Sequence, residues 1–207
     1  MRIRWFGHSC FLLTNADGKK LLTDPFDPSV GYPVPKEKVD VVTMSHGHHD
    51  HNWTRDLPRP FASVSEVGET ELSGFKIRGI HSFHDDAEGA KRGDNVIFVI
   101  ESDGERVAHL GDLGHMLTDA QFEAIGKIDA LLIPIGGYYT IDSDTAYAIA
   151  QRIAPRVTIA MHFKTPEMRF PITDEMHFLS LTGGKHFGAN EIDLSTCEGG
   201  TWALDFQ

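Results

Sequence analysis

The stretch at residues 45–51, Ser-His-Gly-His-His-Asp-His, constrains this chain more than any other. It offers four potential metal ligands in the pattern H-x-H-x-D-H, directly after the apolar run 39–44, which predicts a buried strand. Imidazole nitrogens and carboxylate oxygens hold zinc, manganese and iron in proteins. A lone Asp-His pair is usually a solvated turn, but four such groups directly after a strand favour a metal site.

The spacing inside this motif allows two ions. His46 and His48, two residues apart, can face one metal, while Asp50 and His51 can face a second as the backbone turns. His49 is then left over, and we expect it to be exposed or to pack against the protein.

Three more candidates share one position in the predicted topology, because each follows a buried strand, where site groups gather in α/β sheets. They are His84, Asp112 and His162. Two alternatives stay open from the residues alone. Asp112, in a Gly-Asp-Leu-Gly segment, could be a turn residue, and His81 competes with His84 as the ligand.

The remaining pattern predicts a strand-rich first half, with helices in the second half. Thr118 and Gln121 form a capping box that starts a helix. An apolar stripe over 146–153 predicts another helix, which joins the apolar strands 129–135 and 157–161 into a right-handed, parallel βαβ unit. Further strands are expected at 2–6, 10–14, 20–23, 61–64, 71–72, 75–80, 97–100, 106–110 and 201–204, a helix at about 174–181, a short helix or turn at 53–60, and loops at 25–35 and 85–94.

Length and charge narrow the class of protein. A chain of 207 residues fits one domain, residues 1–207, and its 19 basic and 30 acidic residues give a net charge of -11, which disfavours nucleic-acid binding. Cys10 and Cys197 do not form a C-x-x-C motif or a zinc-ribbon spacing, so we expect them to be reduced thiols. The sequence contains neither the apolar segment of a signal peptide nor a run of about 18 apolar residues, so we expect a cytoplasmic protein without membrane contact.

The heptapeptide resembles the signature of the metallo-β-lactamase superfamily. The resemblance continues, in the expected order, through Trp5-Phe6-Gly7-His8-Ser9, Thr23-Asp24-Pro25-Phe26, Ser82-Phe83-His84-Asp85, His109-Leu110-Gly111-Asp112-Leu113-Gly114 and Met161-His162-Phe163. These segments are similar to the small zinc-dependent hydrolases close to L-ascorbate 6-phosphate lactonase. The resemblance implies an α/β fold, a four-layer αββα sandwich of mixed sheets, and it is compatible with a homo-oligomer.

The resemblance also implies a set of site residues. The first metal would be bound by His46, His48 and His84, the second by Asp50, His51 and His162, and both by Asp112. Asp24 would orient a ligand through a hydrogen bond, and His8 would border the metals or the substrate, unless it is a hydrogen-bonded turn residue. Zinc is the expected metal, although such ligands also accept manganese, iron or nickel. By strand parity His109 faces away from Asp112, and His115, His177 and His186 are expected at the surface.

A dinuclear centre of this kind predicts a hydrolase. A bridging hydroxide would attack an ester, lactone or phosphoester of a small anionic substrate, and Asp50 would orient the nucleophile and shuttle its proton. Candidate substrate contacts are Tyr138, Tyr139, Thr140, Lys164 and Arg92. Two alternatives from other classes are a diiron redox protein of the same fold and a non-catalytic metal-binding domain.

Overall fold

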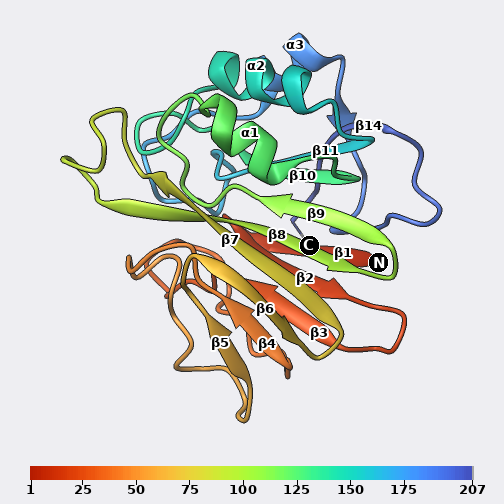
Figure 1. Ribbon diagram of the computed structural model, residues 1–207. Coiled ribbons are helices and arrows are strands. Elements are labelled where there is room, and N and C mark those ends of the chain that lie inside the picture. Colours follow the sequence, from red (N-terminus) through yellow and green to blue (C-terminus); the bar gives the residue numbers. More distant parts are fainter. Residues whose placement is uncertain (207) are drawn as a thin grey trace.

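Two mixed β-sheets face each other in the computed structural model, which describes residues 1–206 (Figure 1). In spatial order the six-stranded sheet contains β13 (Glu191–Asp193), β1 (Arg2–Gly7), β2 (Cys10–Thr14), β3 (Lys20–Thr23), β4 (Val41–Thr43) and β5 (Ala62–Val64). The eight-stranded sheet contains β12 (Lys185–His186), β14 (Gly200–Ala203), β11 (Val157–Met161), β10 (Ala130–Pro134), β9 (Glu105–His109), β8 (Asp94–Ser102), β7 (Phe75–Phe83) and β6 (Gly68–Leu72).

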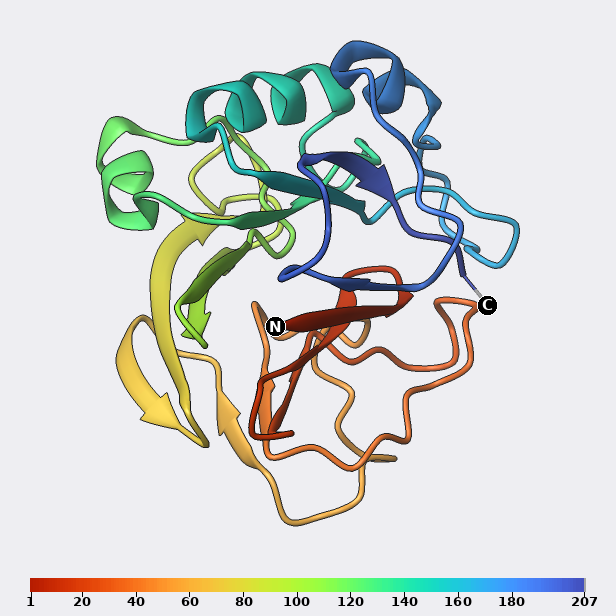
Figure 2. The same cartoon turned by 90° about the vertical axis from the view of Figure 1, so that its right-hand side faces the viewer.

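The helices cover the outer side of the eight-stranded sheet, as Figure 2 shows. They are α1 (Asp119–Ile125), α2 (Ser143–Ile153) and α3 (Met176–Thr182). The predicted capping box starts α1, since the Thr118 side chain accepts from the Gln121 backbone N–H and the Gln121 side chain returns the bond. Ala146, Ile149 and Ala150 form the buried stripe of α2, and the strands on either side of it, β10 and β11, pair in parallel.

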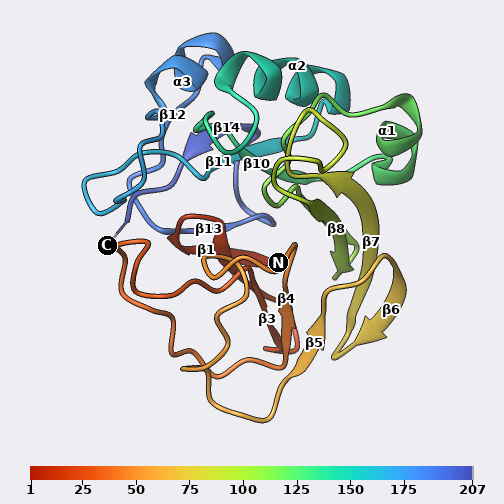
Figure 3. The same cartoon turned by 90° about the vertical axis from the view of Figure 1, so that its left-hand side faces the viewer.

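The outer side of the six-stranded sheet is covered by loops rather than by a helix within residues 1–206 (Figure 3). The loop 24–40 is rich in proline, which lacks the backbone N–H that a helix needs. Residues 53–60 form turns. The side chains of these loops and of the outer sheet face make a second hydrophobic core that contains Cys10, Leu12, Leu22, Phe26, Val30, Tyr32, Val39, Val42, Leu57, Met168 and Ile172. The predicted sandwich of mixed sheets is confirmed, and its fourth layer consists of loops.

The main core fills the space between the two sheets. Trp5 and Phe11 of the first sheet lie in one buried cluster with Phe98 and Ile133 of the second. Strands β12 and β13 were not expected from the sequence, and β6, β7 and β8 are longer than their apolar centres indicate. No helix in residues 1–206 has the length and apolarity needed to cross a bilayer.

Candidate metal centre

Six strands run in one direction toward a common end of the sandwich, and each delivers a site residue there. In the first sheet, β1 and β3 are both antiparallel to β2, and β4 is parallel to β3. In the second sheet, β7 and β9 are both antiparallel to β8 and so run in the same direction. Strand β10 is parallel to both β9 and β11, so β11 also runs in this direction. The residues just past these strands are His8 after β1, Asp24 after β3, residues 46–51 after β4, His84 after β7, Asp112 after β9 and His162 after β11.

Asp112 lies at the centre of this cluster. Its Oδ2 atom is 3.2 Å from His51 Nε2, and 3.3 Å from the Nε2 atoms of both His84 and His162. Donor atoms bound to one ion at about 2.0–2.2 Å are themselves about 3–3.5 Å apart. The Oδ1 atom of Asp112 is buried and has no hydrogen-bond partner within residues 1–206. Asp112 is therefore placed to hold a cation on either side.

The donors fall into two groups around Asp112. One contains the imidazoles of His46, His48 and His84, and another combines His8, Asp50, His51 and His162; within each group the donor atoms lie within 4.8 Å of one another. The Nε2 atom of His46 is buried without a partner in residues 1–206. These nitrogen and oxygen donors, with unpaired atoms facing inward, fit two divalent ions.

Asp24 is fully buried and fixes the tautomers of one histidine in each group. Its Oδ2 atom accepts from His51 Nδ1 at 2.8 Å and from Ser45 Oγ at 2.6 Å. Because Ser45 donates its only proton to Asp24, the 2.9 Å contact between Ser45 Oγ and His46 Nδ1 requires that His46 donate. In their neutral form both histidines therefore turn the lone pair of Nε2 toward the cluster, which is the orienting role expected of Asp24.

The electrostatics of the centre favour a cation. Burial lowers the pKa of His46 to about 3, and burial with the neighbouring His162 lowers the pKa of His8 to about 4, so both imidazoles are neutral at pH 7. Burial would also lower the pKa of His51, but Asp112 and Asp50 hold it well above its usual value. The pKa of Asp112 is well below normal despite its burial, because His162 and His51 surround it. The two carboxylates therefore favour a positive charge at His51 Nε2, which a metal ion would supply in place of a proton.

Comparison with known proteins identifies the family. A profile described as "Beta-lactamase superfamily domain" matches residues 2–162, which is most of the chain. The chain belongs to the β-lactamase superfamily. A UPF0173 metal-dependent hydrolase of Thermoplasma acidophilum is 29% identical over 93% of this chain and 96% of its own length. Another, of Methanoregula boonei, is 33% identical over 81% of this chain and 84% of its own length.

A solved structure supports the fold over the whole chain. A candidate zinc-dependent hydrolase of the metallo-β-lactamase superfamily from Thermotoga maritima is 39% identical, covers 100% of this chain and 99% of its own, and superposes with a TM-score of 0.84. The resemblance to this superfamily is thus confirmed, and so is the prediction of a metal-dependent hydrolase. The nearer likeness to L-ascorbate 6-phosphate lactonase stays a prediction.

A cavity of about 510 Å³ opens onto the donors of the superfamily motif. Arg92 and Tyr139, two of the predicted substrate contacts, line it, and the Arg92 guanidinium lies 5.7 Å from the Tyr139 ring centre. Phe170 also lines the cavity, and its ring centre lies 5.8 Å from that of Tyr139, although no sequence motif pointed to this residue. The cavity therefore combines metal donors, one cation and an aromatic wall.

Three predicted substrate contacts lie elsewhere. The Lys164 ammonium donates to the backbone carbonyls of Met168 and Phe170, so it fastens the loop that carries Phe170 and does not reach the cavity. The Thr140 hydroxyl donates to the Ile141 carbonyl, and the Tyr138 side chain is 69% exposed and does not line the cavity. Only the Tyr138 carbonyl takes part, as the acceptor of a 2.9 Å bond from Arg92.

The remaining histidines do not belong to the two groups of donors. His81 is exposed and bonds Asp94 at 3.0 Å, so the structure places His84, not His81, among the donors. His109 is buried, bonds the Ser9 carbonyl at 2.8 Å and accepts from the Gly111 backbone N–H at 3.1 Å. His115, expected at the surface, is half-buried and accepts from the Phe83 backbone N–H.

His49, His177 and His186 are exposed as expected. His49 also lines the cavity, and its Nδ1 atom lies 3.6 Å from Asp50 Oδ1.

One carboxylate holds the predicted loop 85–94. Asp85 accepts from the backbone N–H groups of Ala87, Gly89, Lys91 and Arg92 at 2.7–3.0 Å. These four bonds fix the backbone at Arg92 and so position its side chain at the cavity.

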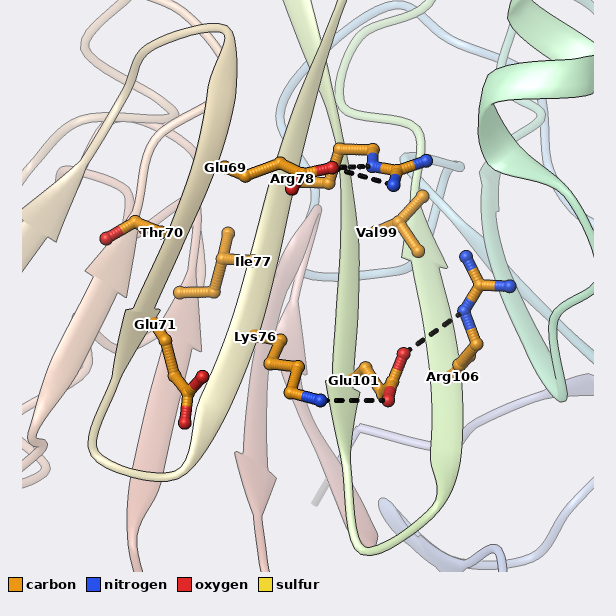
Figure 4. Close-up of a pocket in the computed structure, with 9 residues that line it drawn as sticks. All are labelled: Glu69, Thr70, Glu71, Lys76, Ile77, Arg78, Val99, Glu101 and Arg106. Carbon is orange, nitrogen blue, oxygen red and sulfur yellow. Dashed lines mark hydrogen bonds and ion pairs between the residues drawn. The ribbon is translucent and has the colours of Figure 1, made fainter.

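A second hollow lies on the outer face of β6 to β9 (Figure 4). Its three cationic side chains are all paired with glutamates, Arg78 with Glu69 at 2.7 Å and both Lys76 and Arg106 with Glu101. It holds no histidine and lies away from the strand ends that carry the donors. The cavity beside Asp112 is therefore the candidate site.

Proposed function

We propose that this chain hydrolyses an ester, lactone or phosphoester bond of a small anionic substrate at a dinuclear metal centre. The observation that carries the proposal is the position of Asp112 between two groups of donors at one open cavity. Two divalent ions held there, zinc first among the candidates, would supply hydroxide at neutral pH and polarise the substrate oxygen. The centre would stay net positive, because Asp50, Asp112 and a bridging hydroxide cancel three of the four positive charges.

Asp50 is suited to hold and move the proton of the nucleophile. It lines the cavity, and its Oδ2 atom lies 3.3 Å from His8 Nε2 and 3.6 Å from His51 Nε2. Burial acts to raise the pKa of Asp50, but the neighbouring His51 and His8 lower it far more, so the carboxylate is ionised at neutral pH. An ionised carboxylate at the cavity wall can accept a proton during attack and return it to the leaving group.

The substrate class follows from the other side chains of the cavity. The Arg92 guanidinium uses one of its five N–H groups on the Tyr138 carbonyl, and its side chain makes no further hydrogen bond within residues 1–206. A guanidinium with free N–H groups binds carboxylate or phosphate well. Tyr139 and Phe170 offer an apolar wall beside it. We therefore expect a substrate with an anionic group next to an apolar segment.

The experiment that tests this function is a panel of lactones, esters, phosphomonoesters, phosphodiesters and amides, offered to the metal-loaded protein and to His48→Ala. His48 is exposed at the cavity, so its replacement removes a donor without disturbing the core. Hydrolysis of one bond class by the wild type, lost in His48→Ala, supports the proposal. A rate that is unchanged in His48→Ala places the activity elsewhere.

The same samples separate the two alternative functions. A diiron redox protein would contain iron and absorb visible light, whereas a non-catalytic domain would bind metal and leave every substrate of the panel intact. Metal analysis, a visible spectrum and the substrate panel therefore distinguish all three.

Removal of Arg92 is expected to weaken substrate binding. Arg92→Ala should raise the KM for an anionic substrate about 10- to 100-fold with little change in kcat, because one charge-assisted contact contributes about 1.5–3 kcal/mol. Lys91→Ala is the matched control, since Lys91 lies on the same loop but pairs with Asp86 at 2.5 Å. Equal KM values for the two variants would show that Arg92 does not contact the substrate.

Removal of metal is expected to lower the melting temperature. Each ion present at 100 times its Kd stabilises the folded state by about 2.7 kcal/mol, so a chelator that removes two ions should lower the Tm by roughly 10–20 °C for a chain of this size. Differential scanning calorimetry with and without chelator measures the shift. His48→Ala should show a smaller shift than the wild type, and a Tm that ignores the chelator would argue against tight metal binding.

A further inference from the structure

His8 lies at the same distance from the second group of donors as Asp112 does. Its Nε2 atom is 3.1 Å from His51 Nε2 and 3.3 Å from Asp50 Oδ2, and its ring centre is 4.3 Å from that of His162. For comparison, Asp112 lies 3.2 Å and 3.3 Å from the Nε2 atoms of His51 and His162. His8 is fully buried, so its ring has no contact with bulk water.

The hydrogen bonds of the turn at His8 do not account for its imidazole. Its backbone has φ 54°, a left-handed value that is uncommon outside glycine, although histidine, asparagine and aspartate adopt it more often than other residues. The turn is held through the His8 carbonyl, which accepts from Trp5 Nε1 at 3.0 Å and from the His162 backbone N–H at 3.2 Å. Since the ring takes no part in these bonds, the interpretation of His8 as a hydrogen-bonded turn residue does not explain its side chain.

The hydrogen bonding of His51 indicates that His8 Nε2 must carry a lone pair if a metal is to bind at His51. His51 Nδ1 donates to Asp24, so its Nε2 carries the lone pair that a metal would take. A proton on His8 Nε2 aimed at His51 would block that lone pair. If His8 Nε2 carries a lone pair instead, then the Nε2 atoms of His8 and His51 and the Asp50 carboxylate can all bind one cation. The Nδ1 atom of His8 is buried without a partner in residues 1–206, as are those of His84 and His162, which belong to the predicted ligand set.

We propose that His8 is a direct ligand of the second metal, which gives that position five protein donors: His8, Asp50, His51, His162 and Asp112. This inference rests on the proposed dinuclear centre. The first position has four donors, of which His48 is exposed and His46 half-buried. The second position is thus the more enclosed and binds its ion more tightly, while the first is the one that meets the substrate.

Titration of the metal-free protein with Zn²⁺ and with Co²⁺ tests the assignment. The wild type should bind two equivalents. His8→Gly removes the imidazole and suits the left-handed backbone, so it should fold while one equivalent binds more than about 100-fold more weakly, beyond the 10- to 100-fold cost of losing an outer hydrogen-bond partner. The visible bands of Co²⁺ should change in intensity because a nitrogen ligand is lost, and added imidazole should restore the second equivalent. His8→Asn, which also tolerates this backbone, should behave like His8→Gly.

Trp5→Phe is the matched control, because it removes a hydrogen bond to the His8 carbonyl and keeps the imidazole. It should bind two equivalents with a wild-type cobalt spectrum. Two tight equivalents and an unchanged spectrum in His8→Gly would overturn the role of His8 and leave the hydrolase proposal intact. A wild type that binds no metal would overturn both.

Discussion

Replacement of Asp112 with alanine is expected to abolish metal binding at both positions and to reduce the hydrolytic rate by roughly 10³-fold or more. The reason is geometric, since one carboxylate oxygen lies within 3.3 Å of His84 of the first group and of His51 and His162 of the second. Without it, the two groups of donors face each other across a buried gap with no shared anion. Mass spectrometry of metal content, run beside the rate on the best substrate of the panel, measures both effects.

A control for this variant is Asp94→Ala. Asp94 is an exposed aspartate close to the centre in sequence, and its carboxylate bonds only the exposed His81 within residues 1–206. It should retain two metals and the full rate. Circular dichroism would establish that Asp112→Ala is folded. Two metals retained in a folded Asp112→Ala protein would contradict the central position of this residue.

The sequence was sufficient to locate most of the centre because metal donors followed predicted strands. Asp112 and His162 each come after an apolar run whose end is clear in the sequence, and parallel strands then carry such residues to one edge. The choice of His84 over His81 came from resemblance. Its physical reason is that His81 lies within β7 with its side chain on the exposed face, whereas His84 lies past the strand end.

The substrate side of the cavity was harder to predict, because it is built by loops whose side-chain directions depend on distant contacts. Lys164 follows a strand, as a site residue should, yet the carbonyls of Met168 and Phe170 capture its ammonium. Phe170 reaches the cavity only because that loop folds back. Arg92 was a reasonable candidate, but nothing in the sequence showed that Asp85 would fix its loop through four backbone bonds. Periodicity describes faces of strands and helices and carries no such information about loops.

The turn at Gly111 shows how closely the site is packed. Its φ of 56° suits glycine, and a Cβ atom there would lie 2.3 Å from Asn95 Oδ1 and 2.6 Å from Ser45 Cβ. Asn95 in turn accepts from the Asp112 backbone N–H at 2.9 Å. The position of the central carboxylate therefore depends on the absence of a side chain one residue earlier, a constraint that appears only when β4, β8 and β9 are brought together.

Two substitutions of Asp24 are expected to cause different defects, and the first, Asp24→Ala, should destabilise the fold. Asp24→Ala leaves the Ser45 backbone N–H, the Ser45 hydroxyl and His51 Nδ1 without their buried acceptor. Removing one partner of a buried charged pair costs about 3–5 kcal/mol in all, so the free energy of unfolding should fall by at least about 3 kcal/mol. Denaturant unfolding in the presence of chelator measures this loss without a contribution from metal.

Asp24→Asn tests the tautomer argument separately from stability. The amide oxygen can still accept from the Ser45 backbone N–H, so the protein should remain folded. The amide nitrogen in place of Oδ2 can only donate, and His51 must then accept at Nδ1 and carry its proton on Nε2, where it blocks coordination. Ser45 Oγ loses its acceptor at the same atom and is then free to donate to His46 Nδ1, which leaves the proton of His46 on Nε2 as well. Both equivalents of Zn²⁺ should therefore bind about 10- to 100-fold more weakly although the fold is kept. Wild-type zinc affinity in Asp24→Asn would mean that the two histidines are oriented by packing alone, whereas weaker binding by a folded protein would show that a residue outside the metal sphere decides which imidazole nitrogens are free to bind.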